Sequence, residues 1–406
     1  MATVTETAAL SPCELILNPT DPKYTDVTIR QFQGCPTIAA TRGGRLYVGW
    51  YSGGVREPHI ENFNLLVYSD DYGRSWSEPL LVIPSSRERL VHALDIQLWL
   101  SPDGRLYVYW VQNNVKPAIK NPDGSYVYPG YESDGYIFND STHAEWCVVC
   151  DDPDAANPVF GEARYVDRGF LRCKPLVTSS GRILNFNYDQ MSEYYGYSYS
   201  DDGVNFTHAY GGKKLPTPFD ESMAYERRDG SIRMLARTSV GYAAESISYD
   251  DGISWTDGAL TDIPNANTRL YVSRTPSGRV IMVGNDSSKS RCRMTVYLSD
   301  DDGKSWGCKR CIDEREALSY PDVDFHDDRI YLVYDRERSG QNSAKEILFA
   351  SFTEEDIISG GDIEVSVISK PESKRCGYAG SGHGADMRFG RGDMNILSCR
   401  GNSSIS

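Results

Sequence analysis

The sequence lacks the features that mark membrane, helical and nucleic-acid-binding proteins. Its 406 residues contain no apolar run of about 18 residues, so no transmembrane helix is expected. No long segment repeats its apolar residues with the helical period of about 3.6, so we expect few helices. The net charge of −15 and the pI near 4.9 argue against nucleic acid or an anionic membrane as a partner.

Cysteine is sparse for this length, and no leader peptide is visible. Among the ten cysteines, Cys147/Cys150 and Cys308/Cys311 form two CxxC pairs. The pairs lie far apart, and Cys147 and Cys150 would face opposite sides of a strand. We therefore expect reduced structural thiols, with no metal and no cofactor. Residues 1–12 lack the basic start and apolar core of a signal peptide, so the chain is expected to be cytoplasmic, or secreted with its signal removed.

The abundant residue types favour strands and turns. The chain has 27 Tyr and 36 Gly, and its β-branched runs are short and bounded by Gly, Asp, Asn and Pro. This composition is typical of an all-β protein. A chain of this length can bury a large core, as one repeat-built domain or as two ordinary ones.

One short pattern, Ser-x-Asp-x-Gly-x-x-Trp, returns along the chain. It is intact at residues 69–76, 248–255 and 299–306, and degenerate at residues 199–206. Each copy follows a β-prone run, which indicates a hairpin turn. The Asp accepts hydrogen bonds from the turn's backbone, the Gly supplies a positive φ, and the Trp packs beneath. We expect Trp76, Trp255 and Trp306 to occupy equivalent peripheral places.

A second element, a tight turn that runs into a β-prone segment, recurs between these turns. Its copies begin at residues 42, 102, 180, 229, 277 and 327. Each copy lies upstream of an Asp-containing turn, or of the place where one should be. Each unit therefore contains four antiparallel strands, and six such units predict a six-bladed β-propeller.

The repeat also predicts the boundaries of the blades. They are expected over residues 33–80, 90–165, 170–214, 215–262, 266–312 and 316–370. Together they form a single domain over residues 12–372, followed by a Gly/Ser-rich, poorly ordered tail over 373–406. Residues 115–143 are expected to elaborate a loop of blade two. Residues 14–18 are expected to form a strand that closes the ring.

The segments between the turns resemble the sialidase (neuraminidase) superfamily, whose members are Asp-box, or BNR-repeat, exo-glycosidases. The resemblance covers about residues 30–355. The stretch from Asp220 to Arg237 resembles the family segment in which a Glu begins one strand and an Arg ends the next. In the family, that Glu activates the nucleophile and that Arg binds the substrate carboxylate. The resemblance assigns these roles to Glu221 and Arg237.

A segment near the end of the fifth blade resembles the family strand that carries another carboxylate-binding Arg. Arg291 is the best match. Arg293 is its competitor, because residues two apart share one face of a strand. We expect Arg237 and Arg291 to converge near a common point. Taken alone, the Arg291 segment is also compatible with cross-strand pairing to an acidic neighbour, and Arg237 with a surface position on a hairpin.

The segment Ser319 to Val323 resembles the family's Tyr-Ser-Asp-Leu segment, which holds a nucleophilic Tyr. The counterpart in this chain is Tyr320. A phenol with a pKa of about 10 needs a base within reach, and the resemblance gives that role to Glu221. We therefore expect their side chains to be hydrogen-bonded. Taken alone, Tyr320 is equally compatible with the core or the rim.

The front of the chain departs from the family pattern. Where the family carries the first Arg of its triad, two residues before a Pro, this chain has Gly34. Arg30 and Arg56 lie close enough in the sequence to substitute, although neither matches the motif. The loop in which the family places an acidic proton donor offers Glu57 and Glu61 instead of an Asp. Glu can perform the same proton transfer.

Two residues near the start of blade two are further candidates. Asp95 stands where the family often has a pocket Asp, so a substrate-binding role is expected. His92 would be the base if the protein were a lyase. Arg172 and Lys174, which open blade three, add positive charge.

The resemblance implies a retaining exo-glycoside hydrolase of carbohydrate metabolism, which removes a terminal α-linked acidic sugar from glycans. Sialic acid is the first expectation. A Tyr nucleophile suits an anionic substrate, since a carboxylate would repel it. The alternatives are a hydrolase of another 2-keto-3-deoxy acidic sugar, a propeller lyase acting on a uronic acid, and a non-catalytic glycan-binding propeller. The expected partner is an acidic-sugar-terminated glycan.

Overall fold

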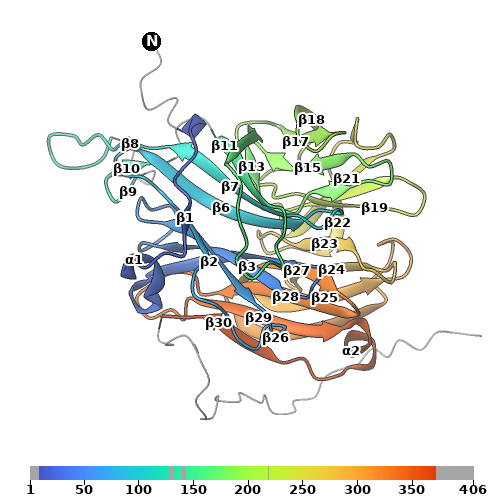
Figure 1. Cartoon of the computed structure of the whole chain (residues 1–406). Coiled ribbons are helices and arrows are strands. Elements are labelled where there is room, and N and C mark those ends of the chain that lie inside the picture. Colours follow the sequence, from blue (N-terminus) through green and yellow to red (C-terminus); the bar gives the residue numbers. More distant parts are fainter. Residues whose placement is uncertain (1–8, 128–131, 139–142, 218, 372–406) are drawn as a thin grey trace, which may run out of the picture.

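Strands dominate the computed structural model, which describes residues 9–127, 132–138, 143–217 and 219–371 (Figure 1). Six antiparallel sheets form a six-bladed β-propeller, which confirms the predicted fold. Besides a 3-10 turn at residues 9–10, the helical turns in the described residues are α1 (Pro22–Thr25), η2 (Val27–Ile29) and α2 (Glu354–Ser359). None of the described helices is long and apolar enough to cross a membrane. The predicted tail, 373–406, lies outside the described residues.

The strands of each blade follow one another along the chain, as the repeat predicts. Blade one contains β2 (Phe32–Ala40), β3 (Leu46–Gly53), β4 (Phe63–Ser69) and β5 (Leu81–Pro84). Blade two contains β6 (Val91–Leu100), β7 (Leu106–Asn114), β11 (His143–Cys150) and β12 (Arg164–Arg168). Blade three contains β14 (Leu176–Val177), β15 (Ile183–Asn185), β17 (Tyr194–Ser200) and β18 (Thr207–Lys213), with β13 (Phe170–Leu171) and β16 (Asn187–Tyr188) paired beside it.

The second half of the ring repeats this order. Blade four contains β19 (Met223–Glu226), β20 (Ile232–Ala236), β21 (Tyr242–Ser248) and β22 (Ala259–Pro264). Blade five contains β23 (Tyr271–Arg274), β24 (Val280–Asn285), β25 (Cys292–Ser299) and β26 (Cys308–Glu316). Blade six contains β27 (Leu318–His326), β28 (Arg329–Arg336), β29 (Glu346–Thr353) and β30 (Val365–Ser369). The insertion of blade two carries a small sheet of β8 (Lys116–Pro117), β9 (Glu132–Ser133) and β10 (Tyr136–Ile137).

The ring closes between blades one and six, which lie next to each other in Figure 1. The prediction that residues 14–18 form the closing strand is wrong. The strand there, β1 (Ile16–Leu17), pairs with β5 at the outer edge of blade one, because both blades already have four strands of their own. Closure instead combines apolar packing between blades one and six with polar contacts. Thr37 Oγ1 and the backbone N–H of Ile38 donate to the Asp322 carboxylate, at 2.7 and 3.0 Å.

The Asp-containing turns have the hydrogen bonds that their sequence predicts. Asp71 accepts from the backbone N–H and the hydroxyl of Ser75, at 2.8 and 2.6 Å, and Gly73 has a φ of 88°. The turns at residues 248–255 and 299–306 repeat these contacts. The following Trp side chains are half-buried. Trp76 and Trp255 pack edge-on against aromatic rings of the preceding blade, whereas Trp306 packs against a ring of its own blade.

Residues with a left-handed backbone conformation lie in or next to the innermost strands, near the centre of the ring. Cys35, Asp95 and Tyr320 each lie at a register shift of their strand and have φ values of 58°, 61° and 54°. Glu221, just before β19, has a φ of 32°. Side chains rarely adopt this left-handed conformation, which costs about 1–3 kcal/mol and is concentrated at functional sites. The bulges turn these side chains toward the same end of the axis.

Candidate active site

A tyrosine, a glutamate and an arginine from different strands form the centre of the site. Tyr320 lies in β27 of blade six, while Glu221 and Arg237 flank the first hairpin of blade four. The Tyr320 hydroxyl donates to Glu221 Oε1 at 2.8 Å, and Arg237 Nη1 donates to Glu221 Oε2 at 2.7 Å. Arg237 Nη1 also donates to the Tyr320 hydroxyl at 3.1 Å. All three side chains are buried.

Four more guanidinium groups surround the Tyr320 ring. Their Cζ atoms lie 4.8–5.8 Å from its centroid, and they belong to Arg172, Arg269, Arg291 and Arg338. Blades three, five and six contribute these side chains. With Arg237, positive charge is concentrated around one phenol in a chain whose net charge is −15. Arginines repel one another unless anions lie between them, so this cluster is suited to an anionic ligand.

The carboxylates in the cluster neutralise only some of these arginines. Arg172 pairs with Asp95 at 2.7 Å, Arg237 with Glu221, and Arg338 with Glu57 at 3.1 Å. Arg269 instead donates to backbone carbonyls of blades one, three and six. Arg291 donates to the backbone carbonyl of Asn267 at 2.7 Å, and the described residues offer it no ion pair. Arg237 and Arg291 both contact Tyr320, as expected, but only Arg237 has a carboxylate partner among the described residues.

Burial and the arginines shift the pKa values of the reactive groups in opposite directions. Burial raises the pKa of Glu221, but Arg237 and Arg172 more than offset this and lower it to about 2. The pKa of Tyr320 is raised by burial and by the Glu221 charge. The resting pair is therefore a neutral phenol hydrogen-bonded to a carboxylate. Burial lowers the pKa of Arg291, and the neighbouring Arg338 and Arg237 lower it further.

The two candidate proton donors lie in different surroundings. Glu57 is half-buried and reaches the cluster through its contact with Arg338. Glu61 points elsewhere, because Lys23 and Arg87 each hold its carboxylate at 2.8 Å. The expectation that Glu61 could act as the acid is therefore wrong.

Three other expected substrate-binding residues also lie outside the cluster. Arg30 is buried under α1 and donates to the backbone carbonyl of Tyr24 at 2.8 Å. Arg56 is exposed and donates to Ser133 of the blade-two insertion at 3.1 Å. Arg293 pairs with Asp286 at 2.6 Å on the exposed face.

Arg293 lies outside the cluster because of a local feature of its strand. β25 has a register shift between Cys292 and Met294, and Arg293 has a φ of 55°. This bulge breaks the alternation of faces, so Arg293 does not share a side with Arg291.

His92 is fully buried behind the site, which contradicts its expected role. Its Nε2 is hydrogen-bonded to the Tyr51 hydroxyl, and its Nδ1 lies 3.0 Å from Asn113 Oδ1. Burial lowers its pKa to about 3, so the ring is neutral near pH 7. A ring without solvent access and with both nitrogens engaged cannot take a proton from a substrate.

Asp95 does lie in the cluster, where its surroundings make it titratable near neutral pH. Burial raises its pKa to about 7, and the charges of Glu57 and Glu221 add to this effect. The Arg172 and Arg269 guanidinium groups oppose it.

Arg269 and Arg338 were missed by the sequence reasoning. Arg269 precedes an innermost strand just as Arg172 does, so comparing the blades position by position would have found it. Nothing near Arg338 in the sequence marks it. Lys174 lies on the axis rather than in the site, with Asp322 and Asp324 at 3.3 and 3.6 Å.

The cysteines of the two CxxC pairs are in different chemical states. Cys147 and Cys150 are free and buried, Cys311 is free, and Cys308 is disulfide-bonded. The two CxxC pairs thus differ, and the expectation of reduced thiols is wrong for Cys308. Within the described ranges, no group of three or more His, Cys, Asp or Glu side chains is arranged to hold a metal ion.

Fold and site together define a six-bladed β-propeller with a tyrosine, a glutamate and arginines gathered at its centre. The chain belongs to the BNR repeat-like domain family, whose model matches residues 44–332. None of the curated proteins matches it in sequence.

Solved structures with the same fold include three sialic-acid enzymes. An intramolecular trans-sialidase from Ruminococcus gnavus, in complex with oseltamivir carboxylate, has 15% identity and a TM-score of 0.62, over 82% of this chain and 96% of that one. The NanB sialidase of Streptococcus pneumoniae has 16% identity and a TM-score of 0.63, over 86% and 71%. The leech intramolecular trans-sialidase, with 2,7-anhydro-Neu5Ac, has 15% identity and a TM-score of 0.64, over 85% and 71%. At these identities the likeness shows the fold.

Proposed function

We propose that the protein is a retaining exo-glycoside hydrolase that removes a terminal α-linked acidic sugar, sialic acid first among the candidates. The observation that carries the proposal is the 2.8 Å hydrogen bond between Tyr320 and Glu221. These residues are 99 positions apart and come from different blades, so nothing local forces them together. A buried phenol in contact with a carboxylate is the arrangement that an activated tyrosine nucleophile requires.

The first step is the attack of Tyr320 Oη on the anomeric carbon. The phenol proton passes to Glu221 Oε1 along the existing hydrogen bond, and the bond to the leaving oxygen breaks. Glu57, in its protonated form, gives that oxygen its proton. In the second step water attacks the same carbon, Glu57 takes the water's proton, and Tyr320 leaves and recovers its own from Glu221. Two displacements retain the configuration.

The substrate's own charge contributes to this proton transfer. In the free protein Arg237 and Arg172 keep Glu221 ionised, so it is a weak base. A substrate carboxylate bound to Arg237 and Arg291 partly neutralises the charge that lowers the pKa of Glu221. The bound anion therefore strengthens Glu221 as a base. This coupling favours activation of Tyr320 when the substrate is in place.

Of the alternatives, a lyase based on His92 fits the geometry least, because that ring is fully buried. A purely glycan-binding propeller would need the arginines but not the Tyr320–Glu221 bond.

The test is a panel of glycosides with different terminal acidic sugars: α-sialosides, α-linked 2-keto-3-deoxy sugars and uronides. Mass spectrometry detects hydrolysis as the addition of water. Elimination and internal anhydro-sugar formation give products of the same mass, so proton NMR separates them by the vinyl proton of the unsaturated product. NMR also reports the configuration of the first-released sugar. Release of the free acidic sugar with retention supports the proposal, and absence of turnover on the whole panel contradicts it.

A further inference from the structure

The space beside Gly34 is filled by a side chain from another blade. A Cβ atom placed on Gly34 would lie 2.2 Å from Arg338 Cδ and 2.7 Å from its Cγ. These distances are far below van der Waals contact, so residue 34 can carry no side chain while Arg338 keeps its position. Gly34 opens the register shift of β2, next to the left-handed Cys35. Arg338 from blade six therefore fills the volume that a side chain at residue 34 of blade one would occupy.

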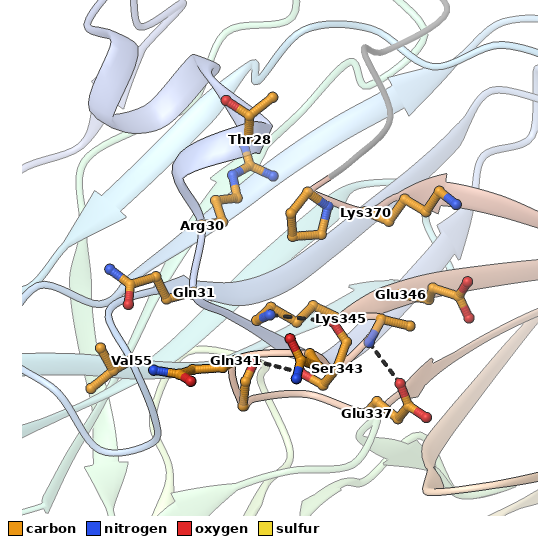
Figure 2. A pocket seen from close by; sticks show the side chains of 14 residues that line it. Thr28, Arg30, Gln31, Val55, Glu337, Gln341, Ser343, Lys345, Glu346 and Lys370 are labelled. Atoms are coloured by element: carbon orange, nitrogen blue, oxygen red, sulfur yellow. Dashed lines mark hydrogen bonds between the residues drawn. The ribbon is translucent and has the colours of Figure 1, made fainter.

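The loop that carries Arg338 is held firmly against blade one. The Arg338 carbonyl accepts from the backbone N–H of Gln33 at 3.0 Å, and the Gln33 side chain donates to the Lys345 carbonyl at 2.9 Å. Within the loop, Glu337 accepts from the backbone N–H of Ala344 at 2.6 Å (Figure 2). These bonds hold both ends of the loop, so Arg338 is positioned before any ligand arrives.

Figure 2 also shows what lies behind this loop. A cavity of about 850 Å³ is lined by its residues Glu337, Gln341, Ser343 and Lys345, but not by Arg338. The Arg338 side chain instead lies beside Tyr320, with Cζ 4.8 Å from the centroid of the ring. The cavity therefore shares no lining residue with the reactive cluster.

The head group of Arg338 keeps hydrogen-bonding capacity for a ligand. Nη1 donates to Cys35 Sγ at 3.0 Å and to Glu57 at 3.1 Å, and Nε lies 4.0 Å from Asp335. Arg338 is 21% exposed, whereas Arg172 and Arg237 are 3% and 7% exposed. Arg338 therefore has the most exposed side chain of these three ion-paired arginines.

We propose that Arg338 binds the carboxylate of the substrate, together with Arg237 and Arg291, and that residue 34 is glycine to let it reach there. This inference rests on the proposed function, because it names the group that grips the acidic sugar. The charge that the family pattern places in the first strand of blade one is here supplied from the β28–β29 loop. The arginine that determines specificity thus comes from blade six instead of blade one. Its side chain still fills the space beside residue 34.

The first test compares an acid with its neutral ester. The probes are the α-methyl glycoside of N-acetylneuraminic acid and its methyl ester, with affinities measured by calorimetry in a Tyr320→Phe parent protein that does not cleave them. Arg338→Met should weaken binding of the acid about 10- to 100-fold, as expected for one charge-assisted contact, and leave the ester unchanged. Arg338→Lys should recover part of the loss. Arg336→Met is the matched control, since Arg336 is also 21% exposed but pairs with Glu337 and Glu346. It should preserve the preference for the acid.

The second test concerns Gly34. Gly34→Ala should weaken acid binding because the new methyl group displaces Arg338, and it should have no further effect in an Arg338→Ala background. Gly34→Arg combined with Arg338→Ala should restore a preference for the acid. Additive losses would contradict the steric coupling.

The outcomes separate this inference from the function itself. If the parent protein prefers the acid and Arg338→Met keeps that preference, the role of Arg338 is wrong and the proposed function stands. If the parent protein binds neither probe and the wild-type protein cleaves no acidic sugar, both are wrong.

Discussion

Replacing Tyr320 with phenylalanine removes one oxygen atom and leaves the ring among its guanidinium neighbours. That oxygen donates to Glu221 at 2.8 Å and accepts from Arg237 at 3.1 Å. Glu221 keeps its own contact with Arg237 at 2.7 Å, so no buried charge is left unpaired. We therefore expect a loss of stability of only about 1 kcal/mol. The nucleophile is gone, so kcat should fall by about 1,000-fold or more.

The same blade offers a matched control for this change. Tyr334 is fully buried in β28, its hydroxyl donates to Asp313 at 3.0 Å, and Asp313 pairs with Arg315 at 2.7 Å. This second tyrosine–carboxylate–arginine group does not contact Tyr320. Tyr334→Phe should therefore cost a similar amount of stability and leave kcat unchanged.

The assay combines thermal melting with steady-state kinetics on a fluorogenic α-glycoside of the acidic sugar that the panel selects. For both variants we expect melting to shift by about 2 °C. Glu221→Gln keeps the shape but not the basicity, and should lower kcat about as much as Tyr320→Phe. The double variant should be no worse than either, because the pair acts as a unit. A Tyr320→Phe protein with kcat within about tenfold of wild type would refute the mechanism and leave the propeller intact.

Three further predictions concern charge and stability. The KM for an anionic substrate should rise as the pH increases through about 7. The reason is that Asp95 is protonated below its pKa of about 7 and adds negative charge to the site above it. When KM is measured over a series of pH values, Asp95→Asn should flatten this dependence. Lys174→Met should lower the free energy of unfolding by about 3–5 kcal/mol in urea, because it leaves Asp322 and Asp324 without their cation. Asp301→Ala should remove the hydrogen bonds to Ser305 and lower stability by about 1–3 kcal/mol, with kcat unchanged in the same kinetic assay.

The repeats made the fold predictable from the sequence. Each Asp-containing turn has a local signature, since its hydrogen bonds join residues at most four apart. Local signatures repeated along a chain determine how many blades there are and where each begins. Tyr320, Glu221, Arg237 and Arg291 were nominated by their motifs, and the structure brings all four to one end of the axis.

The errors have physical causes that no local pattern records. Arg293 was taken to share a face with its neighbour, but a bulge rotates it outward. Glu61 is held by Lys23 and Arg87, contacts that depend on how separate segments fold together. Arg338 was missed because its position follows from the pairing of its loop with blade one, more than 300 residues away.

The way in which the ring closes has a consequence for a chain that emerges from the ribosome. Each blade is built from consecutive strands, so the early blades can form while the rest of the protein is still being made. The last blade carries both Tyr320 and Arg338, and its Asp322 makes two of the polar contacts that join it to the first. A nascent chain therefore has Arg172, Arg237, Arg291 and Glu221 in place before it has Arg338 or a nucleophile. The nucleophile and the contacts that close the ring are both supplied by the last blade. An incomplete translation product would therefore carry no reactive centre.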